Sequence, residues 1–406
     1  MNIVHTSDWH LGHTLYGKKR DEEFRLFLDW LHELLRREKV ELLLVSGDIF
    51  DSGAPGTQAQ TLYYDFLQKI STDPACSVVM TAGNHDSPSF LDAPRQLLSH
   101  LRIHVAGRAL TPEEEVLELP GKAGEPGVII CAVPFLRDRD LYRAAPGDGP
   151  EDRDRKLAEG LRGHYRRCAE AAERLRAGRD MPVIAMGHLF VQGGRVSEGT
   201  DVRVGSLARV ETGVFPPAFD YAALGHLHIP QTAGETRLRY SGSPLPLDFS
   251  ETENRKSVCL LRTHGRDVSV ETVEVPRFRN LLSLNGDWPE LERRLRELSG
   301  AAETIWAEVL YTGQDVLGDL REKVFEAAPP EVDVLRIRNL RELPVSMHTE
   351  EEGAPSLENL TEADVFARLL DEAQLCGEGT EERRKALTAC YDEILREISG
   401  ASREDD

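Results

Sequence analysis

The sequence predicts a layered α/β protein with two or three domains. Apolar runs of roughly four to seven residues alternate with helical patterns through about residue 265, an order typical of sheets covered by helices. At 406 residues the chain exceeds the size of one usual core. Polar side chains that can bind metals directly follow five of the apolar runs, and open α/β sheets place ligands at such strand ends.

The five apolar runs are predicted to be strands at residues 3–6, 42–45, 78–81, 183–186 and 221–224. Between the first two, apolar residues recur at helical spacing from Asp21 to Lys39, which predicts a helix packed on the sheet. Residues 136–160 are charged and rich in turn formers. We therefore expect a surface loop there, leading into a helix at 157–177.

Each predicted strand is followed by a short motif that contains carboxylate, amide or imidazole groups. In the first motif, Asp8 and His10 are two residues apart, which puts both side chains on one side of an extended segment. One such motif is common by chance, but five in order argue against coincidence. In chain order, the candidate ligands are Asp8, His10, Asp48, Asn84, His85, His188, His226 and His228.

Oxygen and imidazole ligands arriving from several strand ends are what a two-metal hydrolytic site requires. Asp48 follows Gly47, which allows a tight turn, and its two carboxylate oxygens can bridge two cations. Such ligands without thiolate favour two Mn²⁺ ions, with Fe or Zn²⁺ as alternatives, whereas Mg²⁺ is less suited to many imidazoles. Other histidines, among them His5 and His13, lack such neighbours and are interpreted as ordinary polar residues.

Charge and cysteine content limit the function classes. The chain has 49 Lys and Arg against 70 Asp and Glu, a net charge of −21, which argues against tight autonomous binding of nucleic acid. Residues 351–406 alone hold 16 acidic and 6 basic side chains. The 6 cysteines show no paired spacing, so no disulfide framework or thiolate zinc site is expected. The chain shows no leader pattern and no membrane-length apolar stretch, so we expect a cytoplasmic enzyme.

The motif order DxH, GDxxD, GNHD, GH and GHxH resembles the calcineurin-like metallophosphoesterase superfamily. The sequence around the motifs is similar to that of the SbcD family of bacterial nuclease subunits. The similar segments are HTSDWHLG at 5–12, GDIFDSGAP at 47–55, AGNHDSPS at 82–89, ALGHLHIPQ at 223–231 and YSGSPLPLDFSE at 240–251. The resemblance covers about the first 255 residues. It implies a two-sheet α/β sandwich flanked by helices, with a dinuclear metal centre.

The resemblance also implies a role for each motif residue. One metal would be held by Asp8, His10, Asp48 and His228, and the other by Asp48, Asn84, His188 and His226. His85 would not be a ligand; it would contact the scissile phosphate or protonate the leaving oxygen, with Asp86 holding its ring. Archaeal and eukaryotic relatives carry a histidine where this chain has Asp51, which we expect to bond its local turn.

The sequence changes character after residue 265. Strand-like runs at 268–275, 278–284, 303–311 and 332–338, with helical patterns at 287–299 and 315–327, predict a small α/β domain that we bound at 266–345. Residues 346–358 are predicted to be an acidic linker and 359–406 two amphipathic helices. The resemblance makes the small domain a DNA cap and the helices the docking segment for an SbcC-like coiled-coil ATPase. Alternatively, the helices fold back as a hairpin.

The resemblance implies a Mn-dependent DNA nuclease of repair and recombination, a homodimer within a heterotetramer. Its activities would be 3′–5′ exonuclease on double-stranded ends and endonuclease on single strands and hairpins. The main alternative is a metallophosphodiesterase for small or cyclic nucleotide esters, which would share the five motifs. A protein phosphatase fits less well because that branch usually reads GDxVDRG and GNHE. An intact ligand set argues against a non-catalytic scaffold.

Overall fold

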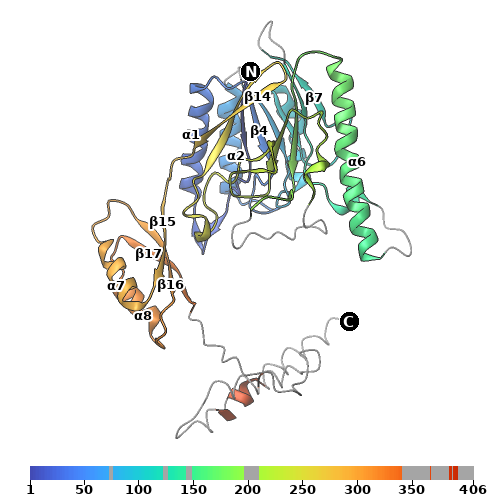
Figure 1. Cartoon of the computed structure of the whole chain (residues 1–406). Helices are drawn as coiled ribbons and strands as arrows, with labels where there is room; N and C mark the ends of the chain where they lie inside the picture. Colours follow the sequence, from blue (N-terminus) through green and yellow to red (C-terminus); the bar gives the residue numbers. More distant parts are fainter. Residues whose placement is uncertain are drawn as a thin grey trace. The chain divides into compact units, whose positions relative to one another are not determined.

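A computed structural model divides the chain into two units, Met1–Arg341 and Glu342–Asp406. The structure describes residues 1–72, 76–121, 127–142, 149–195 and 210–340 of the first unit, and 366, 384–385 and 387–391 of the second. The first unit contains two six-stranded sheets and a separate three-stranded sheet (Figure 1).

The first sheet has the strand order β14-β13-β1-β4-β5-β6. Its parallel strands β1, β4, β5 and β6 are almost wholly buried, as expected where both faces are covered. β13 runs antiparallel to β1, and β14 antiparallel to β13. The bounds are β1 (Asn2–Thr6), β4 (Leu42–Ser46), β5 (Ser77–Thr81), β6 (Ile103–Ala106), β13 (Ser257–His264) and β14 (Asp267–Glu274).

The second sheet has the order β11-β12-β10-β9-β8-β7, with β12, β10, β9 and β8 parallel and both edge strands antiparallel. Apolar side chains of both sheets, such as Leu44 and Ile184, fill the layer between them. The two-sheet sandwich is confirmed. The bounds are β7 (Val116–Leu119), β8 (Val128–Cys131), β9 (Val183–His188), β10 (Tyr221–Gly225), β11 (Gln231–Ala233) and β12 (Glu235–Tyr240).

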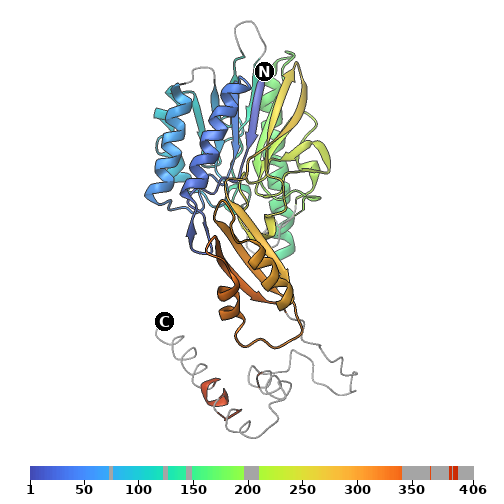
Figure 2. The same ribbon diagram turned by 90° about the vertical axis from the view of Figure 1, so that its left-hand side faces the viewer.

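Helices cover the outer face of each sheet. α1 and α2 lie side by side over the first sheet (Figure 2), and α6 covers the second. α6 begins at Pro150, inside the stretch predicted to be a loop, because proline fits the first helical turn without losing a hydrogen bond. The bounds are α1 (Asp21–Arg37), α2 (Thr57–Thr72), α3 (Pro88–Asp92), α4 (Arg95–His100), α5 (Asp138–Leu141) and α6 (Pro150–Arg176), with 3₁₀ turns η1 (Thr212–Val214) and η2 (Phe249–Glu251) and a hairpin of β2 (Thr14–Leu15) and β3 (Lys18–Lys19).

The small domain is a three-stranded parallel sheet, β15-β16-β17, packed against two helices. It touches the sandwich through Leu281 and Trp306, which pack on Leu15 and Phe249. The strand that we placed at its start, at 268–275, is instead β14 at the edge of the first sheet, because its main chain pairs with β13 along its whole length. The bounds are β15 (Asn280–Gly286), α7 (Trp288–Glu297), β16 (Ile305–Tyr311), α8 (Leu320–Ala327) and β17 (Val332–Asn339).

The predicted linker at 346–358 and most of the predicted C-terminal helices lie outside the described residues. The described positions of the second unit are helical, and the rings of Phe366 and Tyr391 stack with centroids 4.0 Å apart. The cysteines that the structure describes form no disulfide. No described helix combines the length and the apolar character needed to cross a bilayer.

His5, which lies in the layer between the sheets, should make the sandwich sensitive to acid. It is fully buried, its Nδ1 lies 3.0 Å from the Tyr221 hydroxyl, and burial lowers its pKa to about 3. Because this value lies below the unfolded pKa of about 6.5, protonation favours unfolding, and stability falls as the pH drops from 6.5 towards 3. Between pH 7 and pH 5, we expect the free energy of unfolding of His5→Gln to fall by about 2 kcal/mol less than that of the wild type.

Urea unfolding in EDTA, followed by tryptophan fluorescence at each pH, measures this difference. His264→Gln is the matched control, since His264 is exposed at the end of β13. Parallel losses in wild type and His5→Gln would contradict the prediction.

Candidate metal centre

The carboxyl ends of five parallel strands bring the five motifs together. β1, β4 and β5 are neighbours in the first sheet and β9 and β10 in the second, so their loops open at one edge of the sandwich. Backbone pairing continues past the strand ends, since the amide of Asp8 donates to Gly47 and that of His10 to Asp48, both at 3.0 Å. The predicted residues meet at this edge: Asp8, His10, Asp48, Asn84, His85, His188, His226 and His228.

The loop backbones are strained in ways that direct side chains to this edge. Non-glycine residues adopt left-handed backbone only at a cost, so the surrounding contacts must hold it. A Cβ on Gly83 would lie 2.1 Å from Oδ1 of Asp48, and one on Gly225 would lie 1.8 Å from the Ser46 carbonyl oxygen, so only glycine allows these loops to approach. The left-handed residues are Asp8 (φ 53°), His10 (48°), Asp48 (49°) and His226 (97°).

Three imidazoles are oriented by an acceptor behind the ring. In each case Nδ1–H donates a hydrogen bond to the acceptor, so Nε2 is the ring nitrogen that faces the common centre. This arrangement is typical of metal-binding histidines. The pairs are His10 with the Asp51 carboxylate (3.2 Å), His188 with the Ser46 carbonyl (3.0 Å) and His228 with the Glu251 carboxylate (3.2 Å).

The free atoms converge around Asp48. Oδ2 of Asp48 lies 3.1 Å from Nε2 of His188 and 3.6 Å from Nε2 of His10. Oδ1 of Asn84 lies 3.0 Å from Nε2 of His188 and 3.1 Å from Nδ1 of His226. Nε2 of His10 is buried and has no hydrogen-bond partner among the described residues. A buried orphan nitrogen beside carboxylate and amide oxygens is what a bound cation satisfies, so the residues fit a dinuclear centre.

Potential ligand atoms form overlapping groups in which all lie within 4.8 Å of one another. Asp8 and Asp48 each belong to two of these groups. The groups therefore share their carboxylate ligands and are not separate sites. The groups at this edge are Asp8 with His10 and His228, Asp8 with Asp48 and His188, and His10 with Asp48 and His85.

Close contact between carboxylate and imidazole shifts both pKa values. Burial alone would raise the pKa of Asp48, but His188 and His10 outweigh it and hold this pKa well below its usual range. Burial lowers the pKa of His188, and Asp48 outweighs it in turn, raising the pKa to about 9. In the metal-free protein His188 is therefore protonated at neutral pH, so a cation must displace this proton.

Asp86 has a different role from the one expected. Its buried carboxylate accepts hydrogen bonds that tie two motif loops together, whereas Nδ1 of His85 donates to the carbonyl of Asp51 at 2.9 Å. The expectation that Asp86 holds the His85 ring was wrong, because three backbone amides already satisfy the carboxylate. Burial and then Asp48 raise the pKa of Asp86 to about 6. The donors are the amides of Gly83 (2.8 Å), Phe50 (2.9 Å) and Ile49 (3.1 Å).

Asp51 and His13 also join the site. We expected Asp51 to bond its local turn instead of a metal. In the structure its carboxylate contacts His10 and lies 3.0 Å from Nδ1 of His13. Nε2 of His13 in turn lies 3.0 Å from the Leu247 carbonyl. No spacing rule links these three segments, so no pattern along the chain predicts this network.

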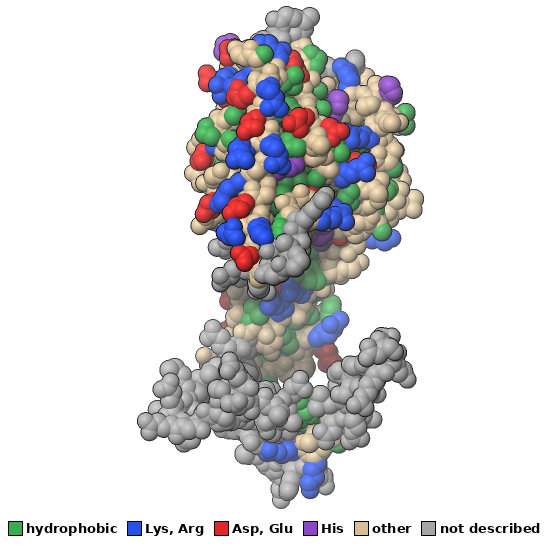
Figure 3. Space-filling model, turned by 90° about the vertical axis from the view of Figure 1, so that its right-hand side faces the viewer, with side chains coloured by type: hydrophobic (Ala, Val, Ile, Leu, Met, Phe, Trp, Pro, Cys, Tyr) green, Lys and Arg blue, Asp and Glu red, His purple; other side chains and the backbone are tan. Residues whose placement is uncertain are grey.

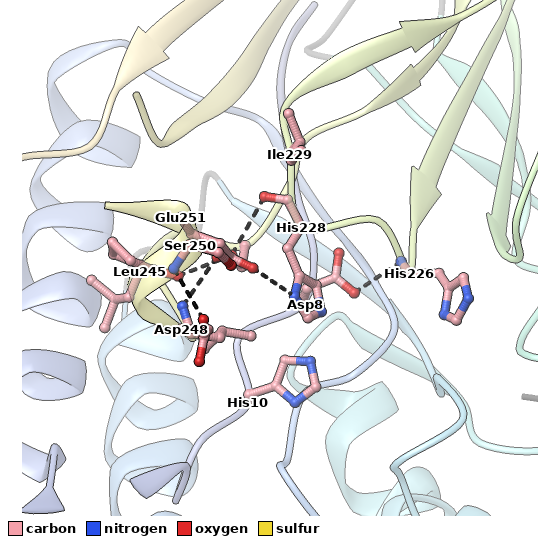
Figure 4. Close-up of polar contacts among 12 residues, drawn as sticks. Asp8, His10, His226, His228, Ile229, Leu245, Asp248, Ser250 and Glu251 are labelled. Atoms are coloured by element: carbon pink, nitrogen blue, oxygen red, sulfur yellow. Dashed lines mark hydrogen bonds and ion pairs between the residues drawn. The ribbon is translucent and has the colours of Figure 1, made fainter. Parts of the chain in front are cut away.

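A buried carboxylate and ammonium behind His228 were also missed. Glu251 is 2% exposed, and Lys256 donates to it at 2.6 Å and to the His228 carbonyl at 3.0 Å. Figure 4 shows Glu251 on one side of the His228 ring and Asp8 on the other. Glu251 ends the segment YSGSPLPLDFSE, so a signal was present, but its link to His228 depends on the fold.

Comparison with known proteins agrees with this geometry. The family model for calcineurin-like phosphoesterases matches residues 1–230, and the model described as type 5 capsule protein repressor C-terminal domain matches residues 277–374. The SbcD subunit of nuclease SbcCD from Escherichia coli (strain K12) is 33% identical over 408 residues, which cover 98% of this chain and 99% of the relative. The chain belongs to the SbcD family of calcineurin-like phosphoesterases.

Other SbcD relatives support the same assignment. The SbcD subunit from Rhodobacter capsulatus is 39% identical over 277 residues, covering 65% of this chain and 67% of the relative. That from Bacillus subtilis is 36% identical over 267 residues, covering 64% and 66%. As an SbcD-family protein, the chain is a metal-dependent phosphodiester hydrolase, and the cluster at the strand ends supplies the donors that this chemistry needs.

Proposed function

We propose that this SbcD-family chain is a Mn²⁺-dependent DNA nuclease that acts with an SbcC-type ATPase. The observation that carries the proposal is the convergence of carboxylate, amide and imidazole donors from five strand ends, in a chain similar along 98% of its length to a component of a nuclease. Imidazole and oxygen donors without thiolate suit manganese better than magnesium. Relatives named as a component of the SbcCD nuclease support the partner.

The overlapping ligand groups support a two-ion assignment. Asp48 is assigned as the bridge because its Oδ2 lies 3.1 Å from Nε2 of His188 and 3.6 Å from Nε2 of His10. Two bound cations would activate the attacking water and neutralise charge that develops on the phosphoryl oxygens. The protein holds the donors in place through buried carboxylates and through the acceptors behind each ring. One ion is assigned to Asp8, His10, Asp48 and His228, and the other to Asp48, Asn84, His188 and His226.

His85 is placed to act on the substrate. It is exposed, and its ring centroid lies 4.9 Å from that of His10. Because Nδ1–H donates to the Asp51 carbonyl, Nε2 is the ring nitrogen left to contact a phosphate, as a donor when the ring is protonated. When the ring is protonated, the same atom can deliver a proton to the leaving oxygen.

The surface charges favour DNA binding shared with a partner. Figure 3 shows basic and acidic side chains interspersed over the face that α6 covers. Many of them are paired, such as Arg155 with Glu159 at 3.3 Å and Arg166 with Glu170 at 3.9 Å. Such a face has little free positive charge for a phosphate backbone. A net charge of −21 therefore fits a nuclease whose ATPase partner and bound cations contribute to DNA binding.

The substrate class can be tested with the purified chain in Mn²⁺. We expect cleavage of hairpin DNA, and stepwise shortening of a 5′-labelled duplex if the 3′–5′ activity holds, with both lost in EDTA. Bis-p-nitrophenyl phosphate is the comparison substrate. Hydrolysis of this small ester without any cleavage of DNA, alone or with the ATPase, would favour a phosphodiesterase for small or cyclic nucleotide esters instead.

A further inference from the structure

A second polar site lies at the edge of the sandwich formed by β11 and β12 of one sheet and β13 and β14 of the other. A cavity of about 360 Å³ opens there, and none of the described residues that line it carries a carboxylate. The chain has 70 acidic residues, yet the described lining of this cavity holds two guanidinium groups and no carboxylate. Its polar lining includes Arg195, Gln231, Thr232, Arg239, Cys259 and Thr272.

Arg239 is the more buried of the two arginines in the described lining. It pairs with Ala223 of β10, whose side chain belongs to the layer between the sheets. Nε of Arg239 is buried without a hydrogen-bond partner, and no ion pair to it is found among the residues that the structure describes. A partly buried guanidinium without a counterion is costly, unlike one in water.

Arg237, on the same strand, is an arginine whose guanidinium has several hydrogen-bond and ion-pair partners. Its guanidinium donates to the carbonyls of Phe215 at 3.0 Å and Phe219 at 3.1 Å and pairs with Glu235 at 2.7 Å. Arg239, two residues on, contacts the Cys259 thiol but has no comparable set of partners in the described part of the chain. Among the described residues, Arg237 is therefore satisfied by its partners, whereas Arg239 is not and lines the cavity.

The groups opposite Arg239 offer it no negative charge. His5, Cys259 and Thr272 are cross-strand neighbours in the first sheet, in that order. His5 is fully buried with its Nε2 unpartnered, and burial, with a contribution from Arg239, lowers its pKa. Burial raises the pKa of the Cys259 thiol, which is therefore neutral. The positive charge is left for a ligand to neutralise.

We propose that this cavity binds a phosphate group, either free or in a phosphate ester up to the size of a mononucleotide, with Arg239 as its main ligand. A guanidinium can bind two phosphate oxygens at once, and hydroxyls such as those of Thr232 and Thr272 can donate to the others. The volume lies within the usual range for small-molecule sites. The cavity residues are not among the proposed metal ligands, so this site does not depend on the nuclease proposal.

Calorimetric titration of the full chain in EDTA tests the site without contribution from bound metal. The probes are inorganic phosphate, dAMP and a ten-nucleotide oligothymidine. We expect saturable binding by wild type and at least tenfold weaker binding by Arg239→Met. Arg262→Gln is the matched control, because it removes an exposed arginine of β13 that pairs with Glu271, and it should bind as wild type does.

The pattern of binding also identifies the source of the phosphate. Binding of phosphate or dAMP that Arg239→Met loses supports a free anion or mononucleotide. Binding of the oligonucleotide alone, lost in the same variant, would overturn the proposal of a small ligand, because Arg239 would then contact the backbone of a longer strand. No saturable binding, or equal binding by wild type and Arg239→Met, overturns the proposal.

A melting measurement separates a ligand from a structural role. Without added anions, Arg239→Met should melt at or above the wild-type temperature, since it removes an unpaired, partly buried charge. Added phosphate or dAMP, whichever binds, should raise the melting temperature of wild type but not of the variant. A variant that melts well below wild type without anions would make Arg239 a structural residue and overturn the proposal.

Discussion

Replacing His188 with alanine is expected to reduce Mn²⁺-dependent turnover by about 10³-fold or more, with the sandwich still folded. Nε2 of His188 lies 3.1 Å from Asp48 and 3.0 Å from Asn84, so the variant removes a donor next to the proposed bridge. The Ser46 carbonyl also loses its donor, which costs roughly 1–3 kcal/mol of stability. Single-turnover cleavage of hairpin DNA across a Mn²⁺ titration measures the effect.

His100→Ala serves as the control, because His100 is an exposed residue at the end of α4 and touches none of the motifs. Circular dichroism and thermal melting should show that both variants retain the fold. If His188→Ala cleaved at the wild-type rate, the assignment of this edge as the catalytic centre would fail. If activity returned at high Mn²⁺, the loss would lie in metal affinity, as a ligand requires.

The fold was predictable where it depends on local pattern. Buried runs such as residues 42–45 are recognisable as strands because they are short and apolar and, in this case, are followed by the turn-forming sequence SGD. The pairing of the strands was not predictable. β13 pairs with β1 so that Arg262 lies opposite Asn2, and no local sequence pattern encodes a contact between residues so far apart. The same limit explains why β14 was assigned to the wrong domain.

In the candidate site, the residues that face the common centre were predictable from their type and order. The residues behind them were not, because Asp51 and Glu251 gain their partners only when distant loops meet. The expected contact between the neighbouring residues His85 and Asp86 was wrong. The His85 side chain is exposed, whereas the Asp86 carboxylate is buried and accepts hydrogen bonds from the loop backbone. Ligand type can thus be inferred from sequence, but the contacts that orient each ligand require the fold.

Glu251→Gln is expected to weaken one of the two Mn²⁺ sites by about 10- to 100-fold. Burial would raise the pKa of Glu251, but Lys256 and His228 outweigh it, so the wild-type carboxylate is ionised and accepts the Nδ1 proton of His228. In the variant, the amide oxygen must turn to Lys256, which donates to this side chain at 2.6 Å. The amide nitrogen then faces His228, which moves the ring proton to Nε2, where the cation has to bind.

The matched control is Glu253→Gln, which removes the same charge from an exposed position two residues away. Calorimetry should give two Mn²⁺ per chain for wild type and the control, and one tight and one weakened ion for Glu251→Gln. Nitrogen NMR of the His228 ring in the metal-free protein, at a pH where the ring is neutral, shows which nitrogen carries the proton. Two tight ions and an unchanged His228 tautomer in Glu251→Gln would show that the Glu251 carboxylate does not orient the metal ligand.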